Sequence, residues 1–134
     1  MPDQHLQRSR NVGDILVVDD DPTIIEMLTE LLLFEGYQVR SGRNGHEALA
    51  AIAAKRPTLL LLDLQMPEMN GAEVIDAIAG TPFADLPIAI ITATPAAAEL
   101  LVGQSNVACM AKPLDLDTLL ASVAEAMRLA DLES

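Results

Sequence analysis

The sequence is short of cysteine, of aromatic residues and of positive charge, and each shortage excludes a class of protein. A single cysteine, Cys109, excludes an intramolecular disulfide and agrees with a reducing cytoplasm. One Tyr, two Phe and no Trp among 134 residues leave aliphatic side chains and Met to fill the core. Eight Lys and Arg stand against 20 Asp and Glu, a formal net charge of -12. This balance argues strongly against direct nucleic acid binding, because too few cations are available to displace the counterions of phosphates.

Long apolar runs are also missing. The longest, such as residues 59 to 62, are far too short to cross a bilayer. No basic segment followed by an apolar one opens the chain, so we expect a cytoplasmic location with neither an export signal nor a membrane span. The length suits one domain, which we place at residues 13–131. Residues 1–12 are polar and lack periodicity, which predicts a disordered tail, and residues 132–134 form the C-terminal end.

Segments typical of strands alternate with amphipathic segments typical of helices. The expected strands are the apolar or alternating runs at 15–18, 37–41, 58–63, 87–92 and 106–111. The expected helices are 22–35, 44–55, 70–79, a short one that starts at Thr94–Pro95 and breaks near Gly103, and 115–130. This alternation predicts an α/β fold with a parallel sheet covered by helices on both faces. In such sheets the ligand site lies at the carboxyl ends of the strands.

Chemically useful side chains stand at those strand ends. The first expected strand is followed by Asp19 and Asp20, the third ends in Asp63, the fourth ends in Thr92, and the fifth leads into Lys112. Several carboxylate oxygens at one edge suit a hard divalent cation such as Mg²⁺. A carboxylate can also attack phosphorus to form an acyl phosphate. A neighbouring ammonium and hydroxyl would then neutralise and hydrogen-bond the phosphoryl oxygens.

The acidic stretch "DILVVDDDPT" (residues 14 to 23) has two interpretations. Asp19, Asp21 and Thr23 fit a D-x-D-x-T pattern, in which Asp19 would be the nucleophile of a phosphatase and Asp21 its acid–base. Alternatively the cluster only holds a metal, and Asp21 caps the helix that begins at Pro22.

The motifs "ILVVDDDP", "LLLLDLQMPEMNG", "IITA" and "AKPL" occur in this order and, over about residues 14 to 130, resemble the receiver domain of bacterial response regulators. The resemblance implies a flavodoxin-like, doubly wound, five-stranded parallel sheet of order 2-1-3-4-5 with five helices. A haloacid-dehalogenase-type phosphatase, the alternative, fits only the first motif and assigns no role to the loop after Asp63.

The resemblance also implies which residues bind the phosphoryl group and its metal. Asp63 would be the phosphoacceptor. Mg²⁺, or Mn²⁺, would be held by Asp63, by Asp20 directly, by Asp19 mainly through water, and by the backbone carbonyl of Gln65.

Further residues would stabilise the phosphoryl group and respond to it. Thr92 would follow the phosphoryl group as the conformational switch and Lys112 would pair with it, before a cis peptide bond to Pro113. Gln65 and Thr94, each two residues beyond a site residue, stand where the family tunes hydrolysis of the acyl phosphate. Gln65 could orient an attacking water and Thr94 could donate to the phosphoryl group, or both could be solvated loop residues.

The expected function is a signalling switch rather than a metabolic enzyme. The phosphoryl group would come from a sensor histidine kinase or a phosphotransfer protein, and its transfer would alter binding to an unknown downstream protein. No output domain follows the last helix, so a stand-alone receiver is expected. Cys109 stands where the family carries an aromatic ring, three residues before Lys112. This departure leaves open a receiver-fold interaction module that works without phosphorylation.

Overall fold

The computed structural model describes residues 13–98 and 106–133. The predicted tail at residues 1–12 therefore lies outside the described residues, as does the part after residue 98 of the helix predicted from Thr94–Pro95 to about Gly103. No helix in the described part of the chain combines the length and the apolar character needed to span a membrane.

Five parallel strands form one sheet, and each strand begins within one residue of its predicted start. They are β1 (Asp14–Val18), β2 (Gln38–Gly42), β3 (Leu59–Asp63), β4 (Ile88–Thr92) and β5 (Val107–Ala111). Their order is β2-β1-β3-β4-β5, which confirms the predicted flavodoxin-like topology. Every residue of β1, β3 and β4 is buried, as expected for strands that helices cover on both faces.

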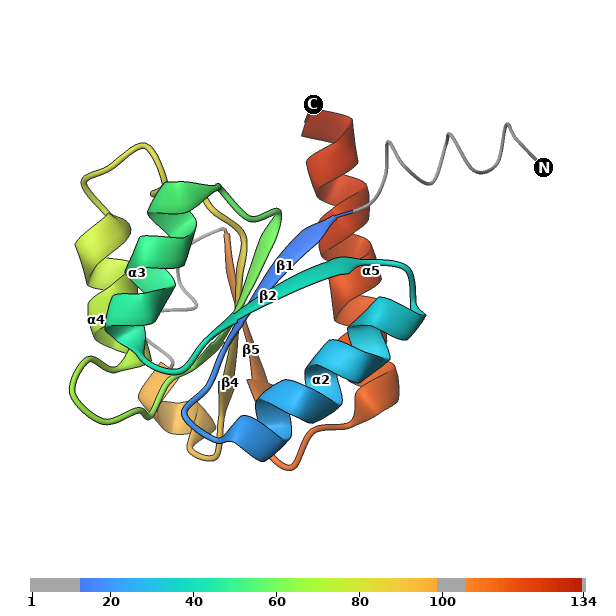
Figure 1. Ribbon diagram of the computed structural model, residues 1–134, viewed down its shortest axis with the longest axis horizontal. Coiled ribbons are helices and arrows are strands. Elements are labelled where there is room, and N and C mark those ends of the chain that lie inside the picture. The colour runs from blue at the N-terminus through green and yellow to red at the C-terminus, as the bar shows by residue number, and fades with distance from the viewer. Residues whose placement is uncertain (1–12, 99–105, 134) are drawn as a thin grey trace.

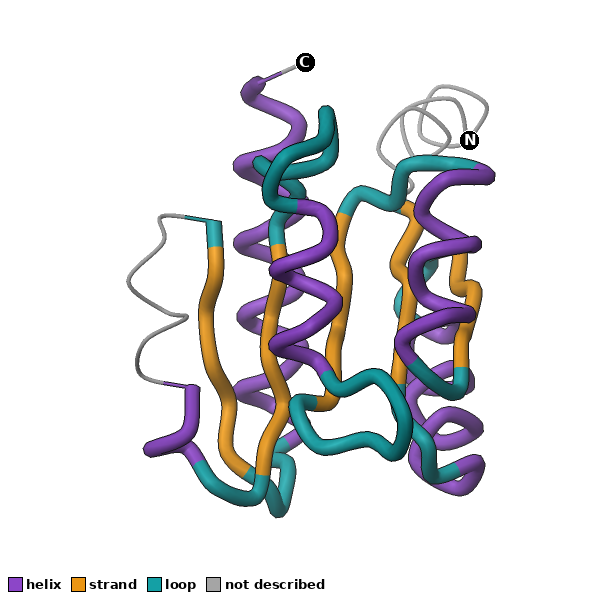
Figure 2. Tube along the Cα trace, turned by 90° about the vertical axis from the view of Figure 1, so that its left-hand side faces the viewer, coloured by secondary structure: helices purple, strands orange, loops and turns teal. Residues whose placement is uncertain are grey.

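Four α-helices, rather than the expected five, are present in the described residues. The helices α2 (Pro22–Phe34) and α5 (Leu116–Glu133) cover one face of the sheet, and α3 (Gly45–Ala54) and α4 (Gly71–Ile78) cover the other (Figure 1). Figure 2 looks onto the face that α3 and α4 cover, with the strands side by side behind them. Where a further helix was expected to begin, Pro95–Ala98 forms one short 3-10 turn, η1. The hydroxyl of Thr94, expected to cap that helix, is instead bonded to Gln65 and Thr92.

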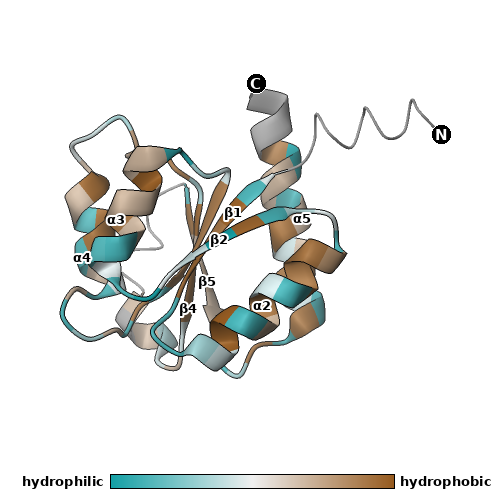
Figure 3. Cartoon of the chain, viewed as in Figure 1, coloured by the Kyte–Doolittle hydropathy of each residue, from teal (hydrophilic) through white to brown (hydrophobic). Residues whose placement is uncertain are grey.

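Two separate apolar clusters form the core, one on each face of the sheet. Alternate residues of each strand point to opposite faces, so that β1 supplies Leu16 to one cluster and Ile15 to the other. Figure 3 shows apolar residues concentrated in the inner strands of the sheet, whereas β2 at its edge is largely hydrophilic and the helices have mixed surfaces. Burial of each large aliphatic side chain contributes about 1.5–3 kcal/mol, which makes this double-sided sheet the rigid frame of the molecule.

Side-chain caps set where the helices begin. Asp21 accepts the backbone N–H of Thr23 at 2.9 Å and caps α2, which confirms the cap predicted for it. Asn70 and Glu73 form a reciprocal capping box at α4. At α3, Asn44 caps the helix as predicted, but the carboxylate of Glu47 accepts the N–H of Arg43 and not that of Asn44. The loop there turns one residue earlier than a standard capping box requires.

A buried ion pair closes the amino-terminal edge of the sheet. The guanidinium of Arg40 on β2 donates to both carboxylate oxygens of Asp14 on β1, with Nη2 to Oδ2 at 2.7 Å. The same guanidinium donates to the carbonyls of Ala51 and Lys55, at 2.8 and 2.7 Å. Arg40 therefore ties β1, β2 and the end of α3 together, and its charge complements the negative end of the helix dipole.

We expect Arg40→Met to lower the free energy of unfolding by about 2 to 3 kcal/mol, measured by urea denaturation. The variant leaves the carboxylate of Asp14, whose side chain is 9% exposed, without its charge partner. This loss in unfolding free energy is small for the removal of one partner of a buried ion pair, because the Arg40 side chain is 30% exposed. The control is Arg43→Met, a change at an exposed arginine, which should alter stability by less than about 0.5 kcal/mol. Equal losses in both variants would contradict a structural role for the pair.

Candidate functional site

Carboxylates gather where the two central strands end. β1 and β3 pair in parallel with Val18 opposite Leu62, so Asp19 and Asp63 follow on adjacent strands. Their exposed fractions are only 2% and 4%, whereas Asp20 is exposed. One carboxylate oxygen from each of these three Asp residues lies within 4.8 Å of the others. This edge is the topological switch point of the sheet, and its oxygen donors have the chemistry that binds Mg²⁺.

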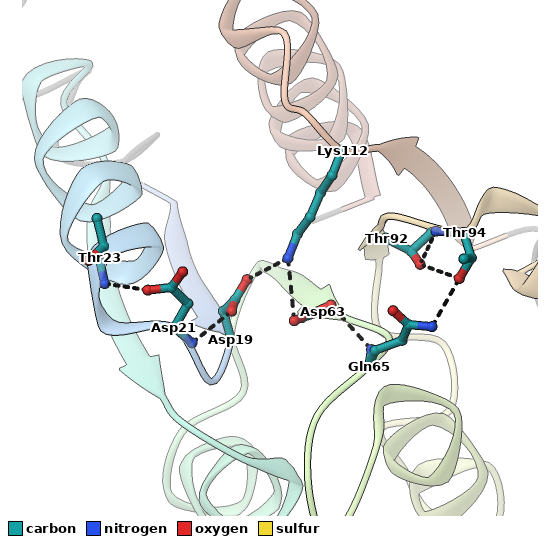
Figure 4. A network of polar contacts seen from close by, with 8 residues as sticks. All are labelled: Asp19, Asp21, Thr23, Asp63, Gln65, Thr92, Thr94 and Lys112. Atoms are coloured by element: carbon teal, nitrogen blue, oxygen red, sulfur yellow. Dashed lines mark hydrogen bonds and ion pairs between the residues drawn. The ribbon is translucent and has the colours of Figure 1, made fainter.

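Lys112 brings one positive charge to this cluster from the far end of the chain. Its Nζ lies 3.4 Å from Oδ2 of Asp19 and 3.5 Å from Oδ2 of Asp63 (Figure 4). The backbone N–H of Lys112 donates to the carbonyl of Thr92 at 2.8 Å, which extends the β4–β5 pairing and fixes the start of the side chain. The following peptide bond to Pro113 is cis, as predicted.

Backbone donors hold the two buried carboxylates in place. Oδ1 of Asp19 accepts the N–H of Asp21 at 2.9 Å, and Oδ1 of Asp63 accepts the N–H of Gln65 at 3.2 Å. Each carboxylate therefore uses one oxygen for its own loop and turns the other, Oδ2, toward Lys112. The two Oδ2 atoms thus lie on the side of Lys112, away from the backbone donors.

The electrostatics of the cluster are only partly balanced. Burial, and then the negative charge of Asp19, raise the pKa of Asp63 above its ordinary value, while the N–H of Gln65 and the charge of Lys112 oppose the rise. Burial alone would lower the pKa of Lys112, but Asp19 and Asp63 together raise it. Lys112 is therefore firmly protonated, and Asp63 still carries the cost of a charge next to another carboxylate. A divalent cation would relieve that repulsion.

Three hydroxyl and amide side chains form a second group beside Asp63. The buried Thr92 lies with Thr94 and Gln65, and hydrogen bonds join the three (Figure 4). Asp19, Asp20, Asp63 and Lys112 form the first group. The structure thus brings the side chains predicted for the site, except that of Cys109, to one edge, in two adjoining groups.

Cys109 is not part of either group. It lies on β5 opposite Ile90, half-buried, and packs against the core cluster on the α3 and α4 face. Burial raises the pKa of its thiol, so the unreactive protonated form dominates at neutral pH. These features agree with the interpretation of Cys109 as a small apolar side chain.

A close backbone approach at Gly71 was not anticipated from the sequence. Gly71 is the first residue of α4, and its N–H donates to the carbonyl of Leu64 at 2.9 Å. A Cβ at this position would lie 2.7 Å from the carbonyl oxygen of Asp63 and 2.9 Å from Cα of Leu64. Only glycine lets the helix begin directly against the backbone of Asp63. The glycine that ends "MPEMNG" was the available signal.

The sheet order and the acidic edge define a receiver domain, and comparison with known proteins agrees. The family model described as the response regulator receiver domain matches residues 15–124, so the chain belongs to this family of two-component signalling domains. The response regulator MprA of Mycobacterium tuberculosis is 41% identical over 116 residues, which are 85% of this chain and 50% of that protein. The chain thus spans about half the length of the curated relatives it matches.

Solved structures of receiver domains superpose closely on this chain. The signal receiver domain of a putative LuxO repressor protein from Vibrio parahaemolyticus has a TM-score of 0.83 at 27% identity and covers 91% of this chain and 95% of its own. The response regulator TrrA from Thermotoga maritima, solved in complex with Mg²⁺ and BeF, has a TM-score of 0.77 at 33% identity. That match covers 86% of this chain and 99% of TrrA.

We expect Gly71→Ala to destabilise the protein by about 1 to 3 kcal/mol, because the added methyl group meets backbone atoms that cannot rotate away. The amide NMR signals of Asp63 and Leu64 should move as well. Gly80→Ala is the matched control, since a Cβ there meets nothing within 4 Å, and it should leave stability within about 0.5 kcal/mol. Unchanged amide signals in Gly71→Ala would show that the loop tolerates the methyl group.

Proposed function

We propose that this domain is a phosphorylation-dependent switch and that Asp63 accepts the phosphoryl group. The observation that best supports this proposal is the environment of the Asp63 carboxylate. Its side chain is almost fully buried. One oxygen accepts a backbone N–H, and the other lies 3.5 Å from the ammonium of Lys112. A carboxylate in this position has one oxygen free to react and a cation beside it.

The reaction we propose is transfer from a phosphohistidine of a sensor histidine kinase or phosphotransfer protein. Oδ2 of Asp63 forms the new bond to phosphorus as the bond from phosphorus to the histidine nitrogen breaks, and that electron pair stays on the imidazole. The products are an acyl phosphate on Asp63 and an unmodified histidine on the donor. Only ionised Asp63 can attack. Burial and the charge of Asp19 raise the pKa of Asp63, and the N–H of Gln65 and the charge of Lys112 oppose part of that rise.

The metal we propose is Mg²⁺ or Mn²⁺, held by Asp19, Asp20, Asp63 and the backbone carbonyl of Gln65. The carboxylate oxygens that gather within 4.8 Å of one another support this assignment, as does the 33% identity to TrrA, which was solved with Mg²⁺. When bound, the ion would supply positive charge to the phosphoryl oxygens, which one ammonium cannot neutralise alone.

Two side chains would respond to the phosphoryl group. Lys112 already lies between the two buried carboxylates and would pair with a phosphoryl oxygen on Asp63. Thr92 would donate a hydrogen bond to another phosphoryl oxygen and so report the modification. The consequence, in this proposal, is altered affinity for a downstream protein in the cytoplasm, without direct binding to nucleic acid.

A receiver-fold interaction module that works without phosphorylation is the second candidate. The observation in its favour is Cys109, half-buried on β5, because the family pattern has an aromatic ring there that moves with the switch threonine. The arrangement of Asp63 and Lys112 favours the phosphorylated switch over this candidate.

Incubation with acetyl phosphate and Mg²⁺, followed by borohydride trapping and mass spectrometry, should place the label on Asp63. Asp63→Asn should abolish labelling, as should removal of Mg²⁺. Asp76→Asn, which changes an exposed aspartate on α4, is the control and should be labelled like the wild type. Label on Asp19 would support the phosphatase interpretation. A wild type that takes no label would support the interaction module that works without phosphorylation.

Thermal unfolding should report metal binding independently of phosphorylation. Because burial and Asp19 raise the pKa of Asp63, its charged form is disfavoured in the folded state, and Asp63→Asn should raise Tm at neutral pH without metal. The gain should shrink as the pH falls through the raised pKa and Asp63 takes up a proton. Mg²⁺ at ten times its Kd should add about 1.4 kcal/mol to the wild type and clearly less to Asp63→Asn. An equal effect on both proteins would mean that the ion binds elsewhere.

A further inference from the structure

A chain of hydrogen bonds joins the β3–α4 loop to the end of β4. Nε2 of Gln65 lies 3.1 Å from Oγ1 of Thr94, and Oγ1 of Thr94 lies 3.3 Å from Oγ1 of Thr92. The backbone N–H of Thr94 also donates to Oγ1 of Thr92, at 3.0 Å (Figure 4). Gln65 and Thr94 are exposed, whereas the side chain they reach, Thr92, is fully buried.

The donors and acceptors in this chain restrict what the Thr92 hydroxyl can do. A hydroxyl has one hydrogen and two lone pairs, and an amide nitrogen can only donate. Gln65 therefore donates to Thr94, and the hydrogen of Thr94 is free to point at Thr92. Either hydroxyl can be the donor between Thr94 and Thr92. When Thr94 donates, both lone pairs of Thr92 are occupied, because the N–H of Thr94 takes the other one. Its own hydrogen is then the only part of the hydroxyl left to form a further bond.

The direction of the chain matters for a phosphoryl group on Asp63. Phosphoryl oxygens only accept hydrogen bonds, so Thr92 is useful to them only as a donor. If Thr92 were instead the donor in its hydrogen bond with Thr94, its hydrogen would not be available to a phosphoryl oxygen. The direction Gln65 to Thr94 to Thr92 would leave the hydrogen of Thr92 available as a donor at the edge of the site.

We propose that Gln65 and Thr94 are positioning residues that act in series, Gln65 through Thr94, to orient the hydroxyl of Thr92. The proposal rests on the function proposed for Asp63. It differs from the expectation that Gln65 orients an attacking water, because in that case Gln65 would act without Thr94. Since both side chains are exposed, the hydrogen bonds contribute more to the orientation of Thr92 than to stability.

A double-mutant cycle separates action in series from independent action. Gln65→Met removes the donor at similar length, and Thr94→Val removes the hydroxyl at similar shape. Each should slow the labelling of Asp63 by acetyl phosphate and Mg²⁺ roughly 2- to 10-fold, as expected for the loss of one hydrogen bond. The double variant should be no slower than Thr94→Val alone, and Thr94→Ser should recover most of the lost rate. A double variant slowed by the product of the two single effects would overturn the proposal.

The unphosphorylated protein allows a second test that does not depend on the function of Asp63. Gln65→Met should shift the methyl NMR signal of Thr92, whereas the distant change Arg43→Met should not. An unchanged Thr92 methyl signal in Gln65→Met would show that Gln65 does not act on Thr92 through these hydrogen bonds. If the wild type takes no label from acetyl phosphate, the proposed function fails, and the NMR comparison still decides whether Gln65 acts on Thr92.

Discussion

Repulsion between buried carboxylates is the constraint on which the site depends. Parallel pairing of β1 with β3 puts Asp19 beside Asp63, both under 5% exposed, and one ammonium serves both. In water such groups would separate, but here the strands that carry them are held by apolar clusters on both faces of the sheet. The energy of the core thus maintains an arrangement that its own electrostatics oppose. A group that brings positive charge, or a modification that changes the charge of Asp63, would therefore change a repulsion that is already present in the folded protein.

The two ends of β1 show how the same residue type can serve structure or function. Asp14 at its start receives three hydrogen bonds from the guanidinium of Arg40, which also donates to the carbonyls of Ala51 in α3 and of Lys55, the C-cap of that helix. All three nitrogens of the guanidinium and both oxygens of the carboxylate are hydrogen-bonded, and such a pair fixes geometry. Asp19 at the other end shares Lys112 with Asp63, so neither carboxylate is fully paired. Incomplete pairing is what leaves capacity for a ligand.

Much of this arrangement was predictable from the sequence, since buried strands and their carboxyl ends follow from apolar runs and the polar residues after them. That reasoning correctly grouped Asp19, Asp63 and Lys112, although Lys112 is 93 residues from Asp19. It could not foresee contacts set by side-chain rotamers or close backbone approach. The bond from Gln65 to Thr94 and the tight start of α4 at Gly71 are of this kind. At the expected start of a further helix the structure has the short 3-10 turn η1, and the hydroxyl of Thr94 is bonded to Gln65 and Thr92; the rest of that expected helix lies outside the described residues.

The backbone around Thr92 limits how a change at Asp63 can spread. Thr92 pairs with Ala111 on β5, and its carbonyl accepts the N–H of Lys112, so the strand itself is held. A response must then begin with the Thr92 side chain rather than with movement of β4. Cys109 on β5 is opposite Ile90 and packs against the apolar core, and it is not among the hydrogen-bond partners of the Thr92 side chain. The remaining connection runs through Thr94, whose backbone and hydroxyl both contact Thr92 and which leads directly into η1. If Asp63 is phosphorylated as proposed, we therefore expect the segment that directly follows β4 to carry the first structural consequence.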